Sequence, residues 1–182
     1  MLTAEQKRIE ARAPDEALCA LVLYIESLRP LPNPNLSDST AAVGRKIFDR
    51  EGCSGCHTHG PYSNNKLTLA AGFQPPAGKP STLDVLPVSV GTDSGLALKT
   101  RKGTGYYKVP SLKGVWYRGR YLHDGSLASL EEMFDPDRLK DTHVPGGWSP
   151  VGIRSRAVVG HEFGLKLSLE DRRSLLAFLK TL

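Results

Sequence analysis

The sequence predicts an all-α domain with long loops, preceded by a helical extension. Amphipathic segments at two places favour this class, one directly before residues 53–57 and one at the end of the chain. Between them, residues 58–105 are rich in Gly, Pro, Asn, Ser and Thr and show little periodicity. Loops of this length are unusual in a compact domain unless a ligand orders them, so we expect them to surround one.

Length and composition are those of an ordinary soluble domain. The chain has 182 residues, 40% hydrophobic and 24% charged, so one domain with an appendage is expected. The longest apolar run, residues 17–25, is too short to cross a bilayer, and no motif indicates nucleic-acid binding. The net charge of +5 comes from scattered lysines and arginines, which favours a solvated surface able to dock an acidic partner.

Two helices are expected at the start of the chain, over about residues 3–12 and from Pro14 to about residue 28. A proline at the start and acidic residues in the first turn suit the N-terminus of the second helix, and apolar side chains recur on one of its faces. Cys19 lies in this helix without a neighbouring cysteine, so we expect a small buried hydrophobic side chain.

Prolines then mark a boundary, because residues 30–36 have the sequence PLPNPNL, which predicts a stiff linker. Residues 21–28 share the register of residues 175–182, and this raises the hypothesis that the extension ends a preceding, related domain. A chance match between two amphipathic helices is the alternative. The expected organisation is a helical extension (1–29), a linker (30–36) and a main domain (37–182).

The main domain is expected to begin and end with a helix. Asp38, Ser39 or Thr40 can cap the start of the first one, and Gly52 has the residue type wanted just after its end. Ser168 begins a capping box at the final helix. Shorter elements are predicted between them: strands at about 84–90 and 96–101, and a capped helical turn at 129–134.

Cys53, Cys56 and His57 form a Cys-X-X-Cys-His motif with small residues between the cysteines. Two thiols at this spacing can each add to a haem vinyl group, and the histidine is then carried under the ring as an axial ligand of iron. The motif predicts one covalently attached haem c, with two thioethers and His57 as the proximal ligand.

Zinc and a plain thiol pair are the alternatives for these cysteines. A structural zinc site needs four nitrogen or sulfur ligands, and with His59 the motif supplies four, but all within residues 53–59 and with no second cysteine pair. A thioredoxin-type pair expects a βαβ setting, which the sequence does not predict. Haem is favoured over both.

A helix directly before a haem motif and another at the end of the chain are the framework of a class I cytochrome c domain. We therefore expect that fold, with the long loops wrapped around the haem. Thioether attachment is normally completed outside the cytoplasm, so we expect a periplasmic or otherwise extracytoplasmic protein. The apolar run follows acidic residues and lacks a small-residue cleavage site, so the chain is expected to be a mature or trimmed form.

Residues 105–115, GYYKVPSLKGV, and 120–127, RYLHDGSL, resemble the C-terminal haem domain of the bacterial di-haem cytochrome c peroxidase and MauG family. The resemblance extends over about residues 44–182 and is most specific at 109–132. It implies a cytochrome c fold in the periplasm and two haems, one that receives electrons and one that meets peroxide. Only one Cys-X-X-Cys-His motif occurs here, so a second haem domain would have been lost or would lie on another chain.

Aromatic and basic residues cluster over about residues 101–121, where they can wall the haem and meet its propionates. A half-buried surface with solvated charges is the alternative. His123 matches a family position near the haem edge, and we expect it to bond to Asp124. The other expected haem contacts are Tyr107, Lys108 and Pro110, with Arg101 or Arg118 at a propionate.

The second axial ligand is expected to be His161, with Met133 as the alternative and an open or water-bound iron as the third option. Residues 160–164, GHEFG, resemble a segment in a branch of this superfamily that includes rubber-cleaving di-haem oxygenases, where a histidine closes this position. Met133 at helical spacing is more often core packing than a ligand. His59 is expected at the surface and His143 in an exposed loop.

Either saturated form of the iron suits one-electron transfer, whereas peroxide or oxygen chemistry needs an open site. The expected function is therefore that of a mono-haem c-type cytochrome serving a redox partner protein, which could itself be another haem domain. The alternative is an electron-relay fragment or subunit of a di-haem cytochrome c peroxidase or oxidase. A haem-based sensor or assembly module, which binds a partner through its first helices, is the third possibility.

Overall fold

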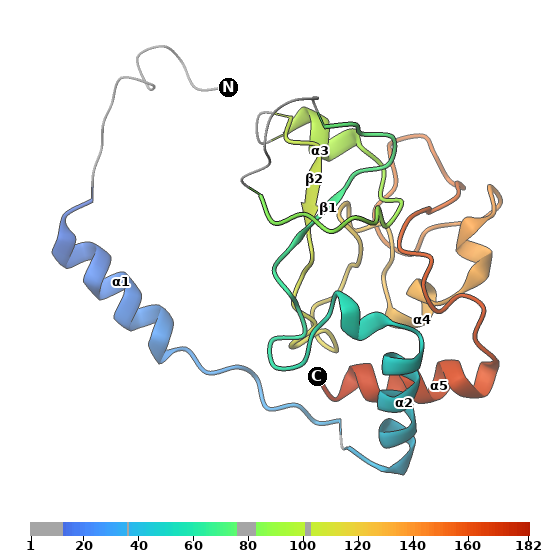
Figure 1. The fold of residues 1–182 in the computed structure, drawn as a ribbon, viewed down its shortest axis with the longest axis horizontal. Helices are drawn as coiled ribbons and strands as arrows, with labels where there is room; N and C mark the ends of the chain where they lie inside the picture. Colours follow the sequence, from blue (N-terminus) through green and yellow to red (C-terminus); the bar gives the residue numbers. More distant parts are fainter. Residues whose placement is uncertain (1–12, 36, 76–82, 101–102) are drawn as a thin grey trace. The chain divides into compact units, whose positions relative to one another are not determined.

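The computed structural model describes residues 13–35, 37–75, 83–100 and 103–182 (Figure 1). The chain divides into two compact units, one ending at Pro32 and one running from Asn33 to Leu182. The elements in chain order are α1 (Asp15–Ser27), α2 (Ser39–Arg50), the 3-10 turn η1 (Cys53–Gly55), β1 (Leu67–Leu69), α3 (Gly95–Lys99), β2 (Tyr106–Lys108), α4 (Leu130–Met133), the 3-10 turn η2 (Pro136–Leu139) and α5 (Leu169–Lys180).

The first unit contains α1, which starts directly after Pro14 as predicted. All its side chains are exposed, including the large apolar ones Leu18, Leu21, Val22, Leu23, Tyr24 and Ile25, and so is Leu28 just after its end. Cys19 is exposed as well, so the prediction of a buried thiol is wrong. The helix has an apolar face but buries no residue, because no described part of its own unit packs on it. The helix expected over residues 3–12 lies outside the described residues.

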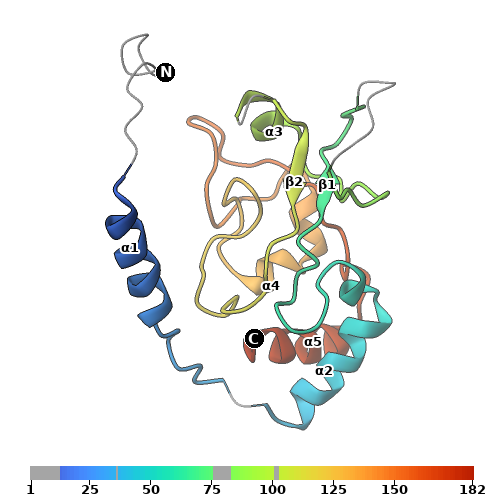
Figure 2. The same cartoon turned by 60° about the vertical axis from the view of Figure 1, so that its left-hand side comes forward.

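The second unit is built on a close pair of helices, α2 and α5, which cross at one end of it while β1 and β2 lie at the other (Figure 2). The Asp38 side chain caps α2 by accepting a hydrogen bond from the Ala41 N–H, and Ser168 caps α5 in the same way. Ser168 was predicted as a cap, and Asp38 was one of the three candidates for the other. Gly44 lets the helices approach, because a Cβ there would lie 1.9 Å from the backbone oxygen of Ser174.

The core of this unit joins the helix pair to the loops above it. The rings of Phe48 and Phe178 meet edge to face with centroids 5.4 Å apart. The buried cluster contains side chains from α2, α4, α5 and the loops: Ile47, Phe48, Val115, Leu127, Leu130, Met133, Phe134, Val158, Leu175, Phe178 and Leu179. Residues far apart in sequence therefore share one core, which fixes the loops on the helices.

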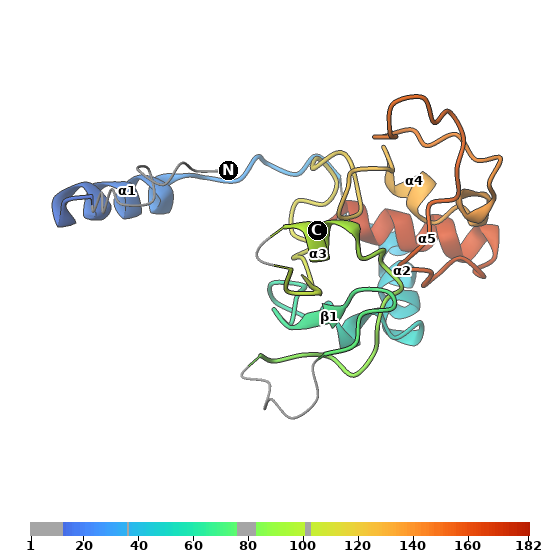
Figure 3. The same ribbon diagram turned by 90° about the horizontal axis from the view of Figure 1, so that it is seen from above.

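The long loops carry only a small sheet, in which β1 pairs antiparallel with β2. The strand expected at 84–90 is reduced to one bridge between Val85 and Leu67. The strand expected at 96–101 is wrong, since α3 occupies this place and Leu, Ala and Lys are strong helix formers. The unit is thus helix-rich with few strands. The view from above places the β1 segment and the loops after α4 on opposite sides of it (Figure 3).

Among the residues that the structure describes, no helix is both long and apolar enough to span a membrane. The start of the second unit is fixed to its final helix, because the Asn33 amide donates a hydrogen bond of 2.8 Å to the backbone oxygen of Lys180.

Candidate haem site

The Cys-X-X-Cys-His motif follows directly from the end of α2. Gly52 has φ +76°, the left-handed conformation that commonly ends a helix, and the motif then forms the turn η1. The backbone N–H of His57 donates to the backbone oxygen of Cys53 at 2.8 Å. Cys53 and Cys56 are both half-buried free thiols. Burial, together with the charge of Glu51, raises the pKa of Cys53 to about 11, so this thiol is protonated at neutral pH.

His57 is buried and carries its proton on a defined nitrogen. Nδ1 lies 3.1 Å from the backbone oxygen of Tyr62, so Nδ1–H donates there and Nε2 is left with a free lone pair. Burial lowers the pKa of His57, and the backbone oxygens of Tyr62 and Pro110 raise it by a smaller amount. A neutral imidazole whose second N–H is bonded to a carbonyl is the usual form of a metal-binding histidine.

The ring of His161 lies next to that of His57, with centroids 6.3 Å apart and an angle of 61° between the rings. Its backbone N–H donates to the backbone oxygen of Val90 at 2.6 Å, and its φ is +50°. Burial, and then the charge of His57, lowers the pKa of His161 to about 4, so this ring is also neutral at pH 7. Its Nδ1 is buried with no hydrogen-bond partner among the described residues.

The spacing of the two rings fits a metal between them. An imidazole nitrogen binds a first-row metal at about 2 Å and lies about 1 Å from its ring centre, so two imidazoles on opposite sides of one metal have centroids about 6 Å apart. Edge-to-face aromatic pairs without a metal have centroids about 4.5–7 Å apart. The metal-bound arrangement is favoured here because both rings are neutral bases and two free thiols precede His57 in the chain. Two imidazoles and two thiols are groups that can hold haem c.

The other haem contacts predicted from the sequence fall into two groups. His123 and Tyr107 come together, with ring centroids 5.0 Å apart. Asp93 links them, because its carboxylate lies 2.7 Å from His123 Nε2 and its backbone oxygen accepts the Tyr107 hydroxyl at 2.8 Å. The expected bond from His123 to Asp124 is wrong, since the Asp124 carboxylate pairs with Arg156.

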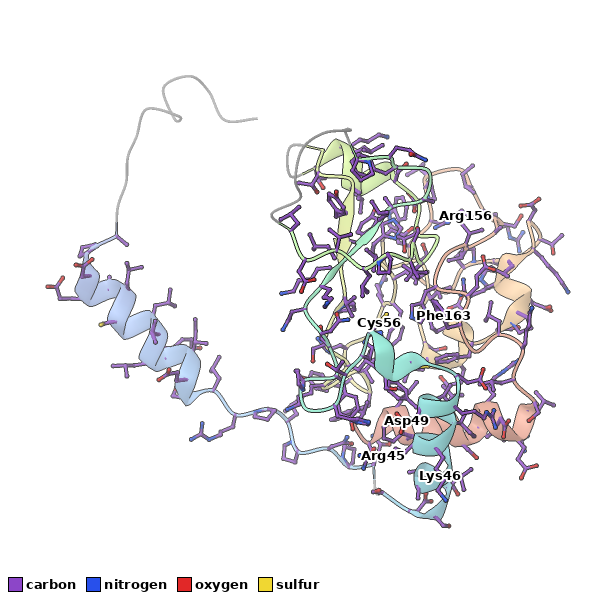
Figure 4. The ribbon with its side chains drawn as sticks, in the orientation of Figure 1. Arg45, Lys46, Asp49, Cys56, Arg156 and Phe163 are labelled. Atoms are coloured by element: carbon purple, nitrogen blue, oxygen red, sulfur yellow. The ribbon has the colours of Figure 1, made fainter. Side chains whose placement is uncertain are left out.

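The second group lies at the surface. Lys108 and Pro110 are exposed, although the backbone oxygen of Pro110 contacts His57. Arg118 is exposed and donates to the backbone oxygen of Ser111 at 2.6 Å, and Arg101 lies outside the described residues. In Figure 4, Arg45, Lys46 and Asp49 lie along α2 and Cys56 lies just beyond its end.

Three further residues were considered as ligands. Met133 is buried in the core cluster, as a packing residue would be. His59 is exposed and lies 3.4 Å from Asp49, as expected. The prediction that His143 lies in an exposed loop is wrong, because its side chain is 13% exposed and its Nε2 lies 3.0 Å from a Glu132 carboxylate oxygen. Glu132 also accepts the N–H of Gly146, which folds this loop back onto α4.

Arg138 is the residue that sequence reasoning missed. It lies in η2, its side chain is 0% exposed, and it donates hydrogen bonds to three backbone oxygens within residues 158–161, the segment that carries His161. Arginine is almost never fully buried, so a lone arginine in a loop sequence gives no reason to expect this position.

No profile of a known protein family matches the chain. It is similar to methylamine utilization protein MauG of Methylorubrum extorquens, with 31% identity over 137 residues, which is 73% of this chain and 31% of that protein. The chain thus spans about a third of the length of this relative.

Among solved structures, it resembles hydrazine synthase of Kuenenia stuttgartiensis, with a TM-score of 0.50 and 18% identity over 93% of this chain and 56% of the other. That likeness concerns the fold alone. A MauG-like protein associated with microbial copper homeostasis gives a TM-score of 0.46 with 21% identity, over 79% of this chain and 46% of the other.

Proposed function

Because this chain belongs to the MauG and di-haem cytochrome c peroxidase family, we propose that it is a mono-haem c-type cytochrome that transfers single electrons. In this proposal residues 37–182 form a class I cytochrome c-like domain. Cys53 and Cys56 hold the haem through thioethers, and His57 and His161 bind its iron. The observation that carries the proposal is the pairing of two neutral histidine rings, 6.3 Å apart, beside two free thiols.

Bound haem supplies an iron that accepts and releases one electron. The chain's own residues would supply two imidazole nitrogens to that iron, and they keep both rings neutral. His57 is oriented by the carbonyl of Tyr62, and both imidazoles sit in surroundings that lower their pKa. If His57 and His161 both bind the iron, no position would remain open for peroxide. Such a saturated site suits electron transfer.

His161 is preferred to Met133 as the second ligand for a structural reason. Met133 packs in the core with Leu130 and Phe134, where a flexible thioether fills space. The ring of His161, by contrast, stands opposite that of His57. His123 and Tyr107, joined through Asp93, are proposed to line the haem edge, where the buried Nδ1 of His123 has no partner among the described residues.

A second candidate is the electron-relay part of a di-haem peroxidase or oxidase. The exposed apolar side chains of α1 favour it, because such a face indicates a partner surface. Because thioether attachment of haem is normally completed outside the cytoplasm, we place the protein there. Its partner would be a redox protein, which in the second candidate is another haem domain.

Optical spectra of the haem-loaded protein test the proposal. We expect a six-coordinate, low-spin spectrum in both oxidation states and no reaction with carbon monoxide. His161→Ala should open the iron, so that the reduced protein binds carbon monoxide fully. Met133→Leu is the matched control, because it removes the sulfur but nearly keeps the volume, and it should leave the spectrum unchanged.

Three results would contradict the proposal. Ready binding of carbon monoxide by the unaltered protein would indicate an open site and favour the peroxidase or oxidase candidate. An open site in Met133→Leu instead of His161→Ala would make Met133 the ligand. Stoichiometric zinc in protein that takes up no haem would return the cysteines to a structural metal site.

A further inference from the structure

Arg138 is a fully buried cation, and its hydrogen bonds all go to backbone oxygens. Nε donates to Met133 at 3.0 Å and Nη1 donates to Val158. Nη2 donates to Gly160 at 3.0 Å and to His161 at 2.9 Å. Three of the four acceptors thus belong to residues 158–161, the segment that carries the proposed ligand, and the fourth is the last residue of α4.

The bonds run in both directions. The backbone N–H of Val158 donates to the backbone oxygen of Arg138 at 2.7 Å, so the segment is fixed to η2 by main chain and side chain together. On its other side the segment is fixed by the bond from the His161 N–H to Val90, and Gly160 packs so closely on Gly91 that a Cβ would lie 3.0 Å from the Gly91 oxygen. The ligand loop is therefore clamped between two parts of the chain.

Two features make this clamp unusual. Within the described residues all the side-chain hydrogen bonds of Arg138 go to backbone oxygens, and the charge of Glu162 offsets only part of the cost of burying this cation. His161 itself has φ +50°, a left-handed conformation that non-glycine residues adopt only when the surroundings hold them there. A neutral side chain in place of Arg138 would avoid the cost of burying a charge. A loop without these hydrogen bonds would allow the backbone of His161 to leave the left-handed conformation. Both costs are retained at one place, next to the proposed iron ligand.

We propose that Arg138 is a positioning residue that holds His161 against the haem iron. This inference rests on the proposed function, since it takes His161 as the second axial ligand. The planar guanidinium offers five donors in a fixed geometry and orders the carbonyls on either side of the ligand. It also places a permanent positive charge behind His161, which disfavours the ferric iron more than the ferrous and raises the reduction potential.

Arg138→Lys and Arg138→Gln separate the two effects. Lysine keeps the charge but cannot reproduce the fork, whereas glutamine loses the charge and most of the donors. Both reduced variants should bind carbon monoxide, which the unaltered protein does not, because His161 leaves the iron more easily; the rate should be at least tenfold above that of the control variants. The midpoint potential should fall in Arg138→Gln and stay near the original value in Arg138→Lys.

Two controls address loss of stability. Leu175→Ala removes a buried core side chain and destabilises the unit without removing a hydrogen bond of Arg138, so it should stay closed to carbon monoxide even where its melting temperature matches that of Arg138→Lys. Arg156→Gln changes another arginine, which is only partly buried and is labelled in Figure 4, and whose side chain binds Asp124 and Ser126 rather than residues 158–161. It should also stay closed.

The outcomes distinguish this inference from the proposed function. If His161→Ala opens the iron but both Arg138 variants react no faster than Leu175→Ala at equal stability, His161 is the ligand and Arg138 does not position it. If His161→Ala leaves the iron closed, the ligand assignment and this inference fall together. An equal midpoint potential in Arg138→Lys and Arg138→Gln would overturn the effect of the charge on the potential, while the positioning role would stand.

Discussion

The two facing histidines are held by different kinds of structure. His57 depends mainly on residues close to it in sequence, because the turn η1 places its backbone and the Tyr62 carbonyl orients its ring. Pro110 is a more distant contact, through its backbone oxygen. His161 depends on Val90 and Arg138, which are far from it in the chain. The first side is thus built together with α2, whereas the second is complete only when three distant loops have met.

This difference assigns separate roles to the two sides. A local turn loses little chain entropy when it forms, but each long-range contact must first close a loop. The side that carries Cys53, Cys56 and His57 needs few long-range contacts, which suits the covalent attachment of haem. The position of His161 depends on tertiary contacts, so substitutions far from it in sequence can change how firmly it binds the iron. We therefore expect variation in reduction potential and in ligand binding to arise on this side.

The largest effect should come from His57→Ala, which removes the proposed proximal ligand. We expect the normal low-spin spectrum to be lost completely, while both thioethers still form because Cys53 and Cys56 remain. Spectra, together with haem retention after denaturation, measure the two parts separately. An unchanged spectrum would contradict the assignment of the proximal ligand.

His59→Ala is the matched control for this experiment. His59 is nearly adjacent in sequence, but it is exposed and lies beside Asp49 at the surface. We expect no change in the spectrum and less than about 0.5 kcal/mol change in the free energy of unfolding. A loss of low-spin haem in this variant would show that the local side extends beyond the motif.

Gly44→Ala tests the packing between α2 and α5, because the motif that carries His57 follows directly from α2. Its Cβ would lie 1.9 Å from the backbone oxygen of Ser174, so α2 and α5 would have to move apart. We expect a loss of about 3 kcal/mol in the free energy of unfolding, at the upper end for overpacking, as measured by denaturant titration.

The control for Gly44→Ala is Gly119→Ala, because no heavy atom lies within 4 Å of a Cβ there and the backbone is not left-handed. Its stability should be unchanged or slightly increased, since alanine restricts the unfolded chain. Equal stability in the two variants would mean that the contact between α2 and α5 is looser than the structure shows.

The same contrast explains which features the sequence could predict. The caps at Asp38 and Ser168 are signals read within four residues, and both helices begin where they indicate. Cys19 and His143 were misplaced because their exposure depends on what packs over them, which residue type does not determine. Arg138 could not be found at all, because its partners are backbone oxygens that any sequence provides.

For the candidate site the division is similar. The motif of residues 53–57 was visible because attachment chemistry requires fixed spacing, and the structure places it in a turn. The partner of His123 was not visible, because Asp93 lies 30 positions away and reaches it only through the loop fold.

The smallest effect is expected from Asp124→Asn, which weakens one long-range contact of the distal side. The Asp124 carboxylate accepts the Ser126 N–H at 3.0 Å and lies 3.2 Å from Arg156 Nη2. Charged hydrogen bonds of this kind contribute about 1.5–3 kcal/mol when fully buried. Because this pair is partly exposed, we expect a loss of about 1 kcal/mol at neutral pH.

The pH dependence of this variant sharpens the test. Burial raises the pKa of Asp124, but the hydrogen bonds of Ser126 and the charges of His123 and Arg156 outweigh it, so the pKa lies below its ordinary value of 3.8. The unfolded chain then binds the proton more readily, and the stability from Asp124 is present above that ordinary value and lost as pH falls through the folded pKa. Unfolding measured from pH 6 down to pH 3 should therefore show a shallower acid loss in Asp124→Asn than in the unaltered protein. Parallel curves would mean that Asp124 is not held by these partners, and that the loops of the distal side are joined by the core alone.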